Sequence, residues 1–322
     1  MIEPMDVVLE SAGCPLGCLA DDEIVLVGRD TLYHMPGSFT VVECRCCGLK
    51  RTSPRPTPNS MGVFYPDNYG PYVSTTVAHK ESLRPKKSRV RSLAGKVFRT
   101  VFEFNTTRIP ALPAGRMLEI GCASGSFLDQ MAAKGWEVRG IEFSATAAEA
   151  ARRLGYAVHV GPLETAPPPD AAFDLLVGWM VLEHLHEPIK GLSKLREWAK
   201  PGAWLVLSVP NAGSLEFTAF KGSWYALQVP THLFHFTPTS IEKVLTAGGW
   251  RLEKVHHQRV MSNLIGSLGL WLIEKGHLRV GSKLASFPDQ SGRWSYLLFP
   301  IAWIFGLAGQ TGRMTIWARA AD

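Results

Sequence analysis

MLEIGCASGSF, residues 117–127, is the stretch of the chain that decides the fold. An apolar run ends at a turn of small residues, and a helix-compatible run follows, which predicts a strand, a tight turn and a helix. The small residues Gly121, Ala123 and Gly125 let the backbone pass close to a ligand without side-chain obstruction. The N–H groups at the start of the helix are then free to bind that ligand. A carboxylate, Glu142, ends the next predicted strand, where it can accept both hydroxyl groups of a ribose.

The spacing of the small residues distinguishes this turn from the turn of a dinucleotide-binding site. Such sites have the pattern G-x-G-x-x-G, which places a pyrophosphate on the end of the helix. Here the pattern is G-x-A-x-G, and Glu119 stands two residues before the first glycine. A carboxylate at that position would repel a pyrophosphate but suits a cationic amino-acid ligand. A glycine-rich turn that binds nothing is the structural alternative.

The composition places the chain among folded globular proteins. Hydrophobic residues make up 46% and charged residues 19% of the 322 residues. A disordered chain would have low hydrophobicity and high net charge, and a polytopic membrane protein would have many long uncharged runs, so both classes are excluded. The net charge of +6 fits an acidic partner, which can be nucleic acid, anionic lipid or a phosphorylated substrate. The start of the chain contains acids and lacks the apolar core of a secretory signal, so a cytoplasmic protein is expected.

From residue 116 onward, short apolar runs alternate with amphipathic runs. This alternation predicts a parallel α/β sheet. The predicted strands are residues 116–120, 136–141, 157–160, 173–178, 204–209 and 250–256, and the predicted helices are residues 124–134, 145–154, 187–199 and 239–247. A last strand-like run, residues 314–319, follows two uncharged stretches at 260–273 and 294–312.

Several short motifs together resemble those of class I S-adenosylmethionine-dependent methyltransferases. They are Glu119-x-Gly121-x-Ala123-x-Gly125, then Glu142, then Phe173-Asp174 and Val181-Leu-Glu183-His184. The resemblance covers residues 116–257 and implies a Rossmann-like α/β fold with a seven-stranded sheet. Residues 314–319 would supply the antiparallel strand of that sheet.

The resemblance also implies a binding site for S-adenosylmethionine. Gly121 and Gly125 would flank the methionine part of the cofactor, and Glu142 would bind its ribose. Leu163 and Glu164 would lie beside the adenine. Ala123 stands in place of the middle glycine of the motif and is small enough to leave binding plausible. The predicted cofactor-binding residues are therefore Glu119, Gly121, Ala123, Gly125, Glu142, Leu163 and Glu164.

Five of the six cysteines lie before residue 48. Cys14-x-x-x-Cys18 and Cys44-x-x-Cys47 form two pairs, and two such pairs suit one tetrahedral structural zinc. Reduced structural thiols are the alternative, because a disulfide framework does not fit a chain that is not exported. The arrangement resembles the cysteine modules of bacterial methyltransferases that act on glycans, antibiotics or sugars.

The acceptor of the methyl group is expected beyond the strand ends, where two groups of histidines fall. The first, His184, belongs to the segment after the fourth strand. In quinone-pathway O-methyltransferases a similar segment presents two acids and a histidine to a metal. Here Met180 takes the place of the first acid, which argues against a catalytic metal. A hydrogen bond of His184 within its own loop is the structural alternative.

The second group lies in residues 224–238, which follow the fifth strand and are predicted to form a lid over the acceptor. The segment contains aromatic residues able to stack on a ring, namely Trp224, Tyr225, Phe234 and Phe236. His232 is the predicted general base, since an unperturbed imidazole titrates at about pH 6.5. A role for His232 only in ordering the lid is the alternative.

The remaining segments suggest contact with an acidic surface. Residues 86–104 predict a basic helix, which can lie on anionic lipid, contact RNA phosphates or cap the sheet. Residues 294–312 reach the lower length of a membrane span. Because residues 314–319 are expected to return to the sheet, a single full crossing is excluded, and a shallow membrane contact or a hydrophobic lid remains.

The predicted division of the chain has five parts. They are a zinc-ribbon-like cysteine module (1–60), a linker with the basic helix (61–113), a methyltransferase core (114–258) with its lid near 211–238, an apolar insertion (259–312) and the final strand of the core (313–322).

The predicted function is S-adenosylmethionine-dependent methylation, on oxygen, of a glycan, lipid-linked or secondary-metabolite acceptor, with peripheral contact to an anionic membrane at its inner face. The alternative enzyme is an RNA methyltransferase that holds RNA through the cysteine module and the basic helix. Val209-Pro-Asn211 stands where an amino-methylation motif of the Asn-Pro-Pro-Tyr type would lie, so nucleic acid is the less favoured partner. The third interpretation is a non-catalytic protein that uses the fold as a scaffold. The intact Glu119 and Glu142 argue against this interpretation.

Overall fold

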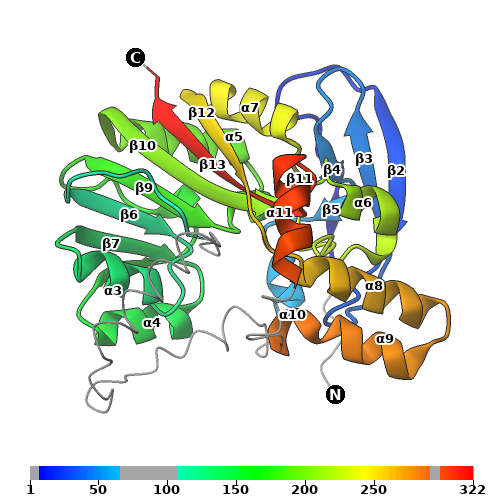
Figure 1. Cartoon of the computed structure of the whole chain (residues 1–322). Coiled ribbons are helices and arrows are strands. Elements are labelled where there is room, and N and C mark those ends of the chain that lie inside the picture. The colour runs from blue at the N-terminus through cyan, green and yellow to red at the C-terminus, as the bar shows by residue number, and fades with distance from the viewer. Residues whose placement is uncertain (1–6, 66–106, 291–297, 322) are drawn as a thin grey trace, which may run out of the picture.

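The computed structural model describes residues 7–65, 107–290 and 298–321 (Figure 1). Its centre is a seven-stranded sheet with the strand order β12-β13-β10-β9-β6-β7-β8. The strands are β6 (Arg116–Ile120), β7 (Glu137–Glu142), β8 (Ala157–Val160), β9 (Phe173–Trp179), β10 (Ala199–Pro210), β12 (Trp250–His257) and β13 (Arg313–Ala320). β13 runs antiparallel between β10 and β12, whereas β8, β7, β6, β9 and β10 pair in parallel. The predicted fold class, with the antiparallel strand near the end of the chain, is confirmed.

Helices cover both faces of this sheet (Figure 1). They are α3 (Ser126–Ala132) and α4 (Ala145–Arg153) on one face, and α5 (Pro188–Glu197) and α7 (Pro238–Ala247) on the other. Consecutive strand residues alternate between the two cores, because successive side chains of a strand point to opposite faces. Met117, Leu175 and Val177 belong to one buried cluster, whereas Leu118 and Leu176 belong to the other.

β10 begins five residues earlier than the predicted strand. The helix before it ends at Glu197, and Ala199 already pairs with Phe173. The register shifts between Ala199 and Trp204. A β-bulge of this kind leaves residues unpaired and interrupts the apolar pattern, so the sequence pattern showed only the regular part of the strand.

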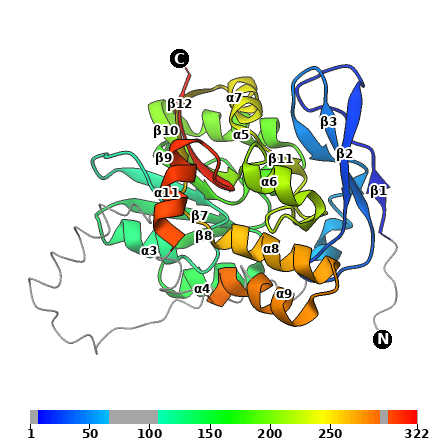
Figure 2. The ribbon, with the colours of Figure 1, turned by 45° about the vertical axis from the view of Figure 1, so that its right-hand side comes forward.

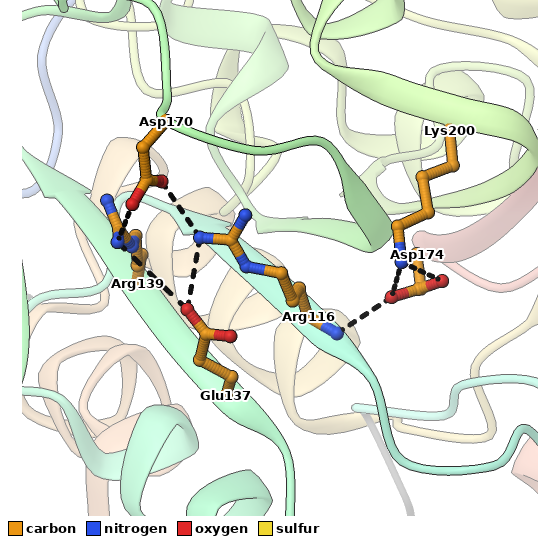
Figure 3. A network of polar contacts seen from close by, with 6 residues as sticks. All are labelled: Arg116, Glu137, Arg139, Asp170, Asp174 and Lys200. Atoms are coloured by element: carbon orange, nitrogen blue, oxygen red, sulfur yellow. Dashed lines mark hydrogen bonds and ion pairs between the residues drawn. The ribbon is translucent and has the colours of Figure 1, made fainter.

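A polar network ties the amino ends of the strands together (Figure 3). The Arg116 guanidinium bonds Glu137 at 3.0 Å and Asp170 at 2.9 Å. One oxygen of Asp174 accepts the backbone N–H of Arg116 at 2.8 Å and also lies 2.8 Å from the Lys200 ammonium. Asp174 belongs to one of the motifs shared with methyltransferases. It lies at the opposite end of the strands from the glycine-rich turn and therefore stabilises the fold.

The N-terminal residues form a second, smaller sheet with the order β11-β4-β3-β2. Its strands are β2 (Asp22–Gly28), β3 (Phe39–Cys44), β4 (Lys50–Thr52) and β11 (Phe234–His235); beside it β1 (Leu9–Glu10) pairs with β5 (Arg55–Pro56), and the 3-10 helix η1 (Met61–Phe64) follows. β11 comes from the predicted lid, so a segment of the core completes the sheet of the cysteine module (Figure 2). Val41 and Leu49 of the module share one hydrophobic cluster with Leu192 and Trp250 of the core.

The apolar insertion forms helices, and the first two of them, drawn in orange, lie below the smaller sheet in both views (Figures 1 and 2). They are α8 (Ser262–Glu274), α9 (Leu278–Ala285), α10 (Phe287–Gln290) and α11 (Phe299–Leu307); α6 (Leu215–Phe220) and the short 3-10 helix η4 (Lys221–Ser223) precede them in the lid region. No helix in the described part of the chain is long and apolar enough to cross a bilayer. The predicted basic helix at residues 86–104 lies outside the described residues, as do residues 291–297.

Candidate active site

The glycine-rich turn joins β6 to α3 in a left-handed backbone path. Gly121, Ala123 and Gly125 have φ angles of 68°, 46° and 82°, a region that glycine enters without steric cost. A side chain at Gly121 would place its Cβ 2.5 Å from Cγ2 of Val181. The turn therefore lies directly against the segment that follows β9, and its close approach requires glycine at residue 121.

Two buried carboxyls stand beside this turn. Glu142 accepts backbone N–H groups, from Ala123 at 2.7 Å and from Ser144 at 2.8 Å. Glu119 is also buried, and its Oε2 has no hydrogen-bond partner among the described residues. Burial raises the pKa of Glu119 well above its ordinary value, and the nearby charge of Glu142 raises that pKa further.

This arrangement fits the cationic end of S-adenosylmethionine. The cofactor carries a sulfonium and an ammonium group, and positive charge favours the ionised form of neighbouring carboxyls. The unpartnered Oε2 of Glu119 can accept an ammonium N–H. Each oxygen of Glu142 retains a further lone pair, which a ribose hydroxyl can use.

The residues predicted to lie beside the adenine come after β8. Leu163 is buried and Glu164 is exposed, both in the 3-10 helix η2 (Leu163–Thr165). Lys194 of α5 donates to the backbone oxygen of Glu164 at 2.8 Å and so fixes this turn to the neighbouring helix. The assignment of Leu163 and Glu164 to adenine stays a prediction.

A second group of polar side chains lies beyond the end of β9. Glu183 and His184, in the 3-10 helix η3 (Leu182–His184), meet His232 from the lid, and one side-chain O or N atom of each lies within 4.8 Å of the others. The two imidazole rings are 4.7 Å apart, edge to face. The structure thus brings together the two predicted catalytic histidines.

Glu183 is the member of this group that the sequence analysis did not select. Its carboxyl is fully buried, and neither oxygen has a hydrogen-bond partner in the described part of the chain. Burial raises its pKa to about 8. Its place next to His184 in the quoted motif was the signal that could have identified it.

Burial also lowers the pKa values of the two histidines. The pKa of His184 falls to about 4. The pKa of His232 lies well below its usual range because of burial first, and then because of the nearby His184 and His235. Both rings are therefore neutral at pH 7, and His232 is a weaker base there than an exposed histidine. The role of His232 as general base stays a prediction.

The lid is bonded to the cysteine module and to the loop after β9. The backbone oxygen of Leu233 accepts the Thr52 N–H at 2.9 Å, and the oxygen of His232 accepts the Thr52 hydroxyl at 2.8 Å. The N–H of Leu233 donates to the backbone oxygen of Glu183 at 2.8 Å. The module therefore fixes the position of His232 relative to Glu183.

The aromatic residues of the lid pack inside the protein. The rings of Phe234 and Phe236 stack on each other 6.0 Å apart, and Trp224 packs edge-to-face on Phe217 at 5.3 Å. These three lid rings and Tyr225 are buried, so they stabilise the lid.

Four cysteines of the module converge. The Sγ atoms of Cys14, Cys18, Cys44 and Cys47 lie within 4.8 Å of one another, and those of Cys14 and Cys47 are 3.5 Å apart. In both pairs a left-handed glycine closes the turn: Gly17 N–H bonds the oxygen of Cys14 at 3.0 Å, and Gly48 N–H that of Cys44 at 2.7 Å. Sulfurs about 3.8 Å apart surround a tetrahedral zinc with Zn–S bonds of about 2.3 Å, so the four predicted ligands fit zinc.

Comparison with known proteins decides the family. The family described as a methyltransferase domain matches residues 93–255, about half of the 322 residues. The chain belongs to this family. The predicted class of enzyme, an S-adenosylmethionine-dependent methyltransferase, is thereby confirmed.

The relatives of this methyltransferase include enzymes that act on oxygen. It is 30% identical over 146 residues to a ubiquinone biosynthesis O-methyltransferase of Hahella chejuensis, across 41% of this chain and 61% of the relative. It is 26% identical over 153 residues to a malonyl-[acyl-carrier protein] O-methyltransferase of Serratia marcescens, across 47% and 58%. The chain thus spans about three fifths of the length of these curated relatives.

Solved methyltransferase structures are similar as well. One is an S-adenosylmethionine-dependent methyltransferase from Mesorhizobium loti, with a TM-score of 0.43 and 15% identity, across 66% of this chain and 93% of that one.

Proposed function

We propose that this methyltransferase transfers the methyl group of S-adenosylmethionine to an oxygen of a small-molecule, glycan or lipid-linked acceptor. The observation that carries the proposal is the contact between the glycine-rich turn and the loop after β9. Gly121 lies against Val181, and two residues further on the chain reaches Glu183, the start of the polar group with His184 and His232. A donor held at the turn and an acceptor held at the histidines would thus be neighbours.

Oxygen as the methylated atom is supported by the relatives, whose names describe O-methyltransferases of ubiquinone biosynthesis and of malonyl-[acyl-carrier protein]. The polar lining supports it too. Glu183, His184 and His232 offer hydrogen-bonding groups to an acceptor hydroxyl, and the aromatic rings of the lid are turned into the core.

The cofactor supplies an activated methyl group on its sulfonium sulfur, which leaves as the C–O bond to the acceptor forms. The work of the protein is therefore to place the two reactants in line, which lowers the barrier by several kcal/mol. Glu119 is proposed to bind the ammonium group and Glu142 the ribose. His184 and His232 are proposed to position the acceptor hydroxyl, and His232 is proposed to accept the proton of that hydroxyl as the bond to carbon forms.

The test is transfer of a labelled methyl group from S-adenosylmethionine to three sets of acceptors: phenols, sugars and lipid-linked sugars. We expect product with one set, and turnover lowered about 100-fold in His232→Ala because positioning and proton transfer are lost. The affinity for the cofactor should stay almost unchanged. His277→Ala, at an exposed histidine of the insertion, is the matched control. If His232→Ala lost cofactor affinity as much as turnover, the role of His232 would be to stabilise the fold.

The apolar insertion is proposed to contact an anionic membrane at its inner face. The outward side of α11 is apolar, with Ile301, Trp303, Ile304 and Leu307 between 44% and 63% exposed. Exposed Lys275, directly after α8, and exposed Arg279 and Lys283 of α9 add positive charge. Apolar residues that enter the headgroup region, together with basic residues, are typical of an interfacial helix.

A further inference from the structure

Helix α8 carries a buried carboxamide in its first turn. Asn263, the second residue of the helix, is only 2% exposed, and neither its Nδ2 nor its Oδ1 forms a hydrogen bond with a described residue. An amide that is buried without a partner destabilises a fold, and the great majority of buried polar side chains have one. None of the roles proposed for the cofactor-binding carboxyls or for the histidines uses Asn263. Its carboxamide is therefore a candidate to bind part of a substrate.

Hydrogen bonds connect this part of α8 to the lid segment that holds His232. The Ser267 hydroxyl, one turn after Asn263, donates to the backbone oxygen of Asn263 at 2.8 Å and accepts the Tyr225 N–H at 2.9 Å. The backbone oxygen of the next lid residue, Ala226, accepts Nδ1–H of His232 at 2.9 Å. The first turn of α8 is thus fixed to the same lid segment as His232.

The chain that leads into α8 is also fixed to the carboxyl ends of the sheet strands. Nε2 of Gln258, four residues before the helix, donates to Ser208 Oγ at 2.7 Å and to Thr315 Oγ1 at 2.9 Å. Ser208 of β10 pairs with Trp179 of β9, and the Trp179 ring packs edge-to-face on Phe127, the second residue of α3, at 5.1 Å. The insertion therefore begins at the edge of the sheet that carries the glycine-rich turn.

The polar groups available at this edge are uncharged. Besides the carboxamide of Asn263, the indole Nε1–H of Trp179 is buried and has no hydrogen-bond partner within the described ranges. An anion could accept from the N–H groups but would be repelled by Oδ1 of Asn263, and a cation could bind only that oxygen. A hydroxyl group both donates and accepts, so two neighbouring hydroxyls can bond Nδ2 and Oδ1 together. This chemistry suits an uncharged polyol.

We propose that Asn263 and Trp179 bind hydroxyl groups of a sugar ring in the acceptor. The hydroxyl that receives the methyl group lies at His184 and His232 in the proposed function, so Asn263 needs further hydroxyls of the same molecule. A sugar ring has them, whereas a simple phenol has a single hydroxyl, which methylation uses. Asn263 thus selects the acceptor and takes no part in the transfer itself. The identification of the sugar as the acceptor rests on the proposed function; the binding of a sugar at Asn263 does not.

The test is a titration of the full chain with the methyl glycosides of glucose, galactose, mannose and rhamnose, followed by saturation-transfer NMR. We expect one or more of them to bind, at least about tenfold more weakly to Asn263→Leu. Leucine is close to asparagine in size, and the amide has no protein partner to lose, so the melting temperature should not fall. Asn59→Leu, at an exposed amide, is the matched control and should bind like the wild type. Trp179→Phe, which removes the N–H but keeps an aromatic ring, is the second variant, with a loss of several-fold expected.

Three results would overturn the proposal: a wild-type chain that binds none of the glycosides, unchanged affinity in Asn263→Leu, or methyl transfer to phenols alone. A lower melting temperature of Asn263→Leu together with weaker binding of S-adenosylmethionine would also overturn it, because the role of Asn263 would then be to stabilise the fold. Calorimetry with S-adenosylmethionine on the same samples separates the two proposals. A chain that binds the cofactor and methylates only phenols contradicts the sugar site alone, and a chain that binds a glycoside but no cofactor contradicts the proposed function alone.

Discussion

At the scale of single residues, Glu216 shows how a buried carboxyl links stability to pH. It stands in the first turn of α6, is almost completely buried and accepts the Gly312 N–H at 3.3 Å. Burial raises its pKa from 4.5 to about 7, and the Gly312 hydrogen bond and Arg313 oppose that rise. The fold therefore favours the protonated form.

We predict that Glu216→Gln makes the free energy of unfolding less dependent on pH. Since the folded pKa of Glu216 is raised, its contribution to stability is fully present below pH 4.5 and is lost as the pH rises through about 7. Relative to Glu216→Gln, the wild-type protein should lose up to about 3 kcal/mol across that range. Urea unfolding at a series of pH values measures this loss, with exposed Glu242→Gln as control. Parallel curves for wild type and Glu216→Gln would contradict the prediction.

The sequence identified the polar residues beside the glycine-rich turn better than those beyond the end of β9. Glu119 and Glu142 belong to one contiguous strand–turn–helix pattern and the strand after it, so their proximity follows from local structure. Glu183 and His232 are 49 residues apart, and their meeting depends on the path of the lid.

At the scale of elements, β11 connects the cysteine module to the candidate active site. Its residues Phe234 and His235 pair with Arg51 and Lys50 of β4. A two-residue strand has no periodicity that a sequence pattern could show, so this pairing was not predicted. Through the pairing of β11 with β4, the turns that carry the cysteines influence the position of His232.

We predict that Cys47→Ser removes a structural zinc and impairs the acceptor side of the site more than the cofactor side. Metal analysis of wild-type protein should find about one zinc per chain, lost in Cys47→Ser because three thiolates bind zinc more weakly than four. Methyl transfer should fall while the affinity for S-adenosylmethionine changes little. Cys46→Ser, at an exposed cysteine outside the cluster, is the matched control. A wild-type protein that folds without metal would contradict this assignment.

At the scale of the whole molecule, the sheet was more predictable than the insertion. The strands from Arg116–Ile120 to Arg313–Ala320 appear in the sequence as short apolar runs between turns. Apart from the early start of β10, their ends were predicted to within one residue. Residues 260–273 and 294–312 are uncharged, and helix α11 is apolar on all sides. Without a polar face the sequence has no helical period, and the predicted alternatives for this region were a lid or a membrane contact.

We predict that the insertion binds anionic membranes through α11. Ile304→Glu should lower the fraction of protein that floats with anionic liposomes at low salt by about tenfold, because a charge enters the apolar face. Ile24→Glu is the matched control, since Ile24 is 67% exposed on β2 and Ile304 is 61% exposed on α11. Absence of wild-type protein from the floating fraction would leave these helices as a lid over the core.

The most direct test of the whole account is the binding of S-adenosylmethionine, measured by calorimetry. We expect the wild-type chain to bind it and not to bind NAD, and Glu142→Ala to weaken binding by more than about 1 kcal/mol, because the hydrogen bonds of the carboxylate to the ribose hydroxyls are lost. Glu149→Ala, at an exposed carboxylate of α4, should bind like the wild type. A wild-type chain that does not bind S-adenosylmethionine, or a Glu142→Ala variant with unchanged affinity, would contradict the assignment of this turn as the cofactor site.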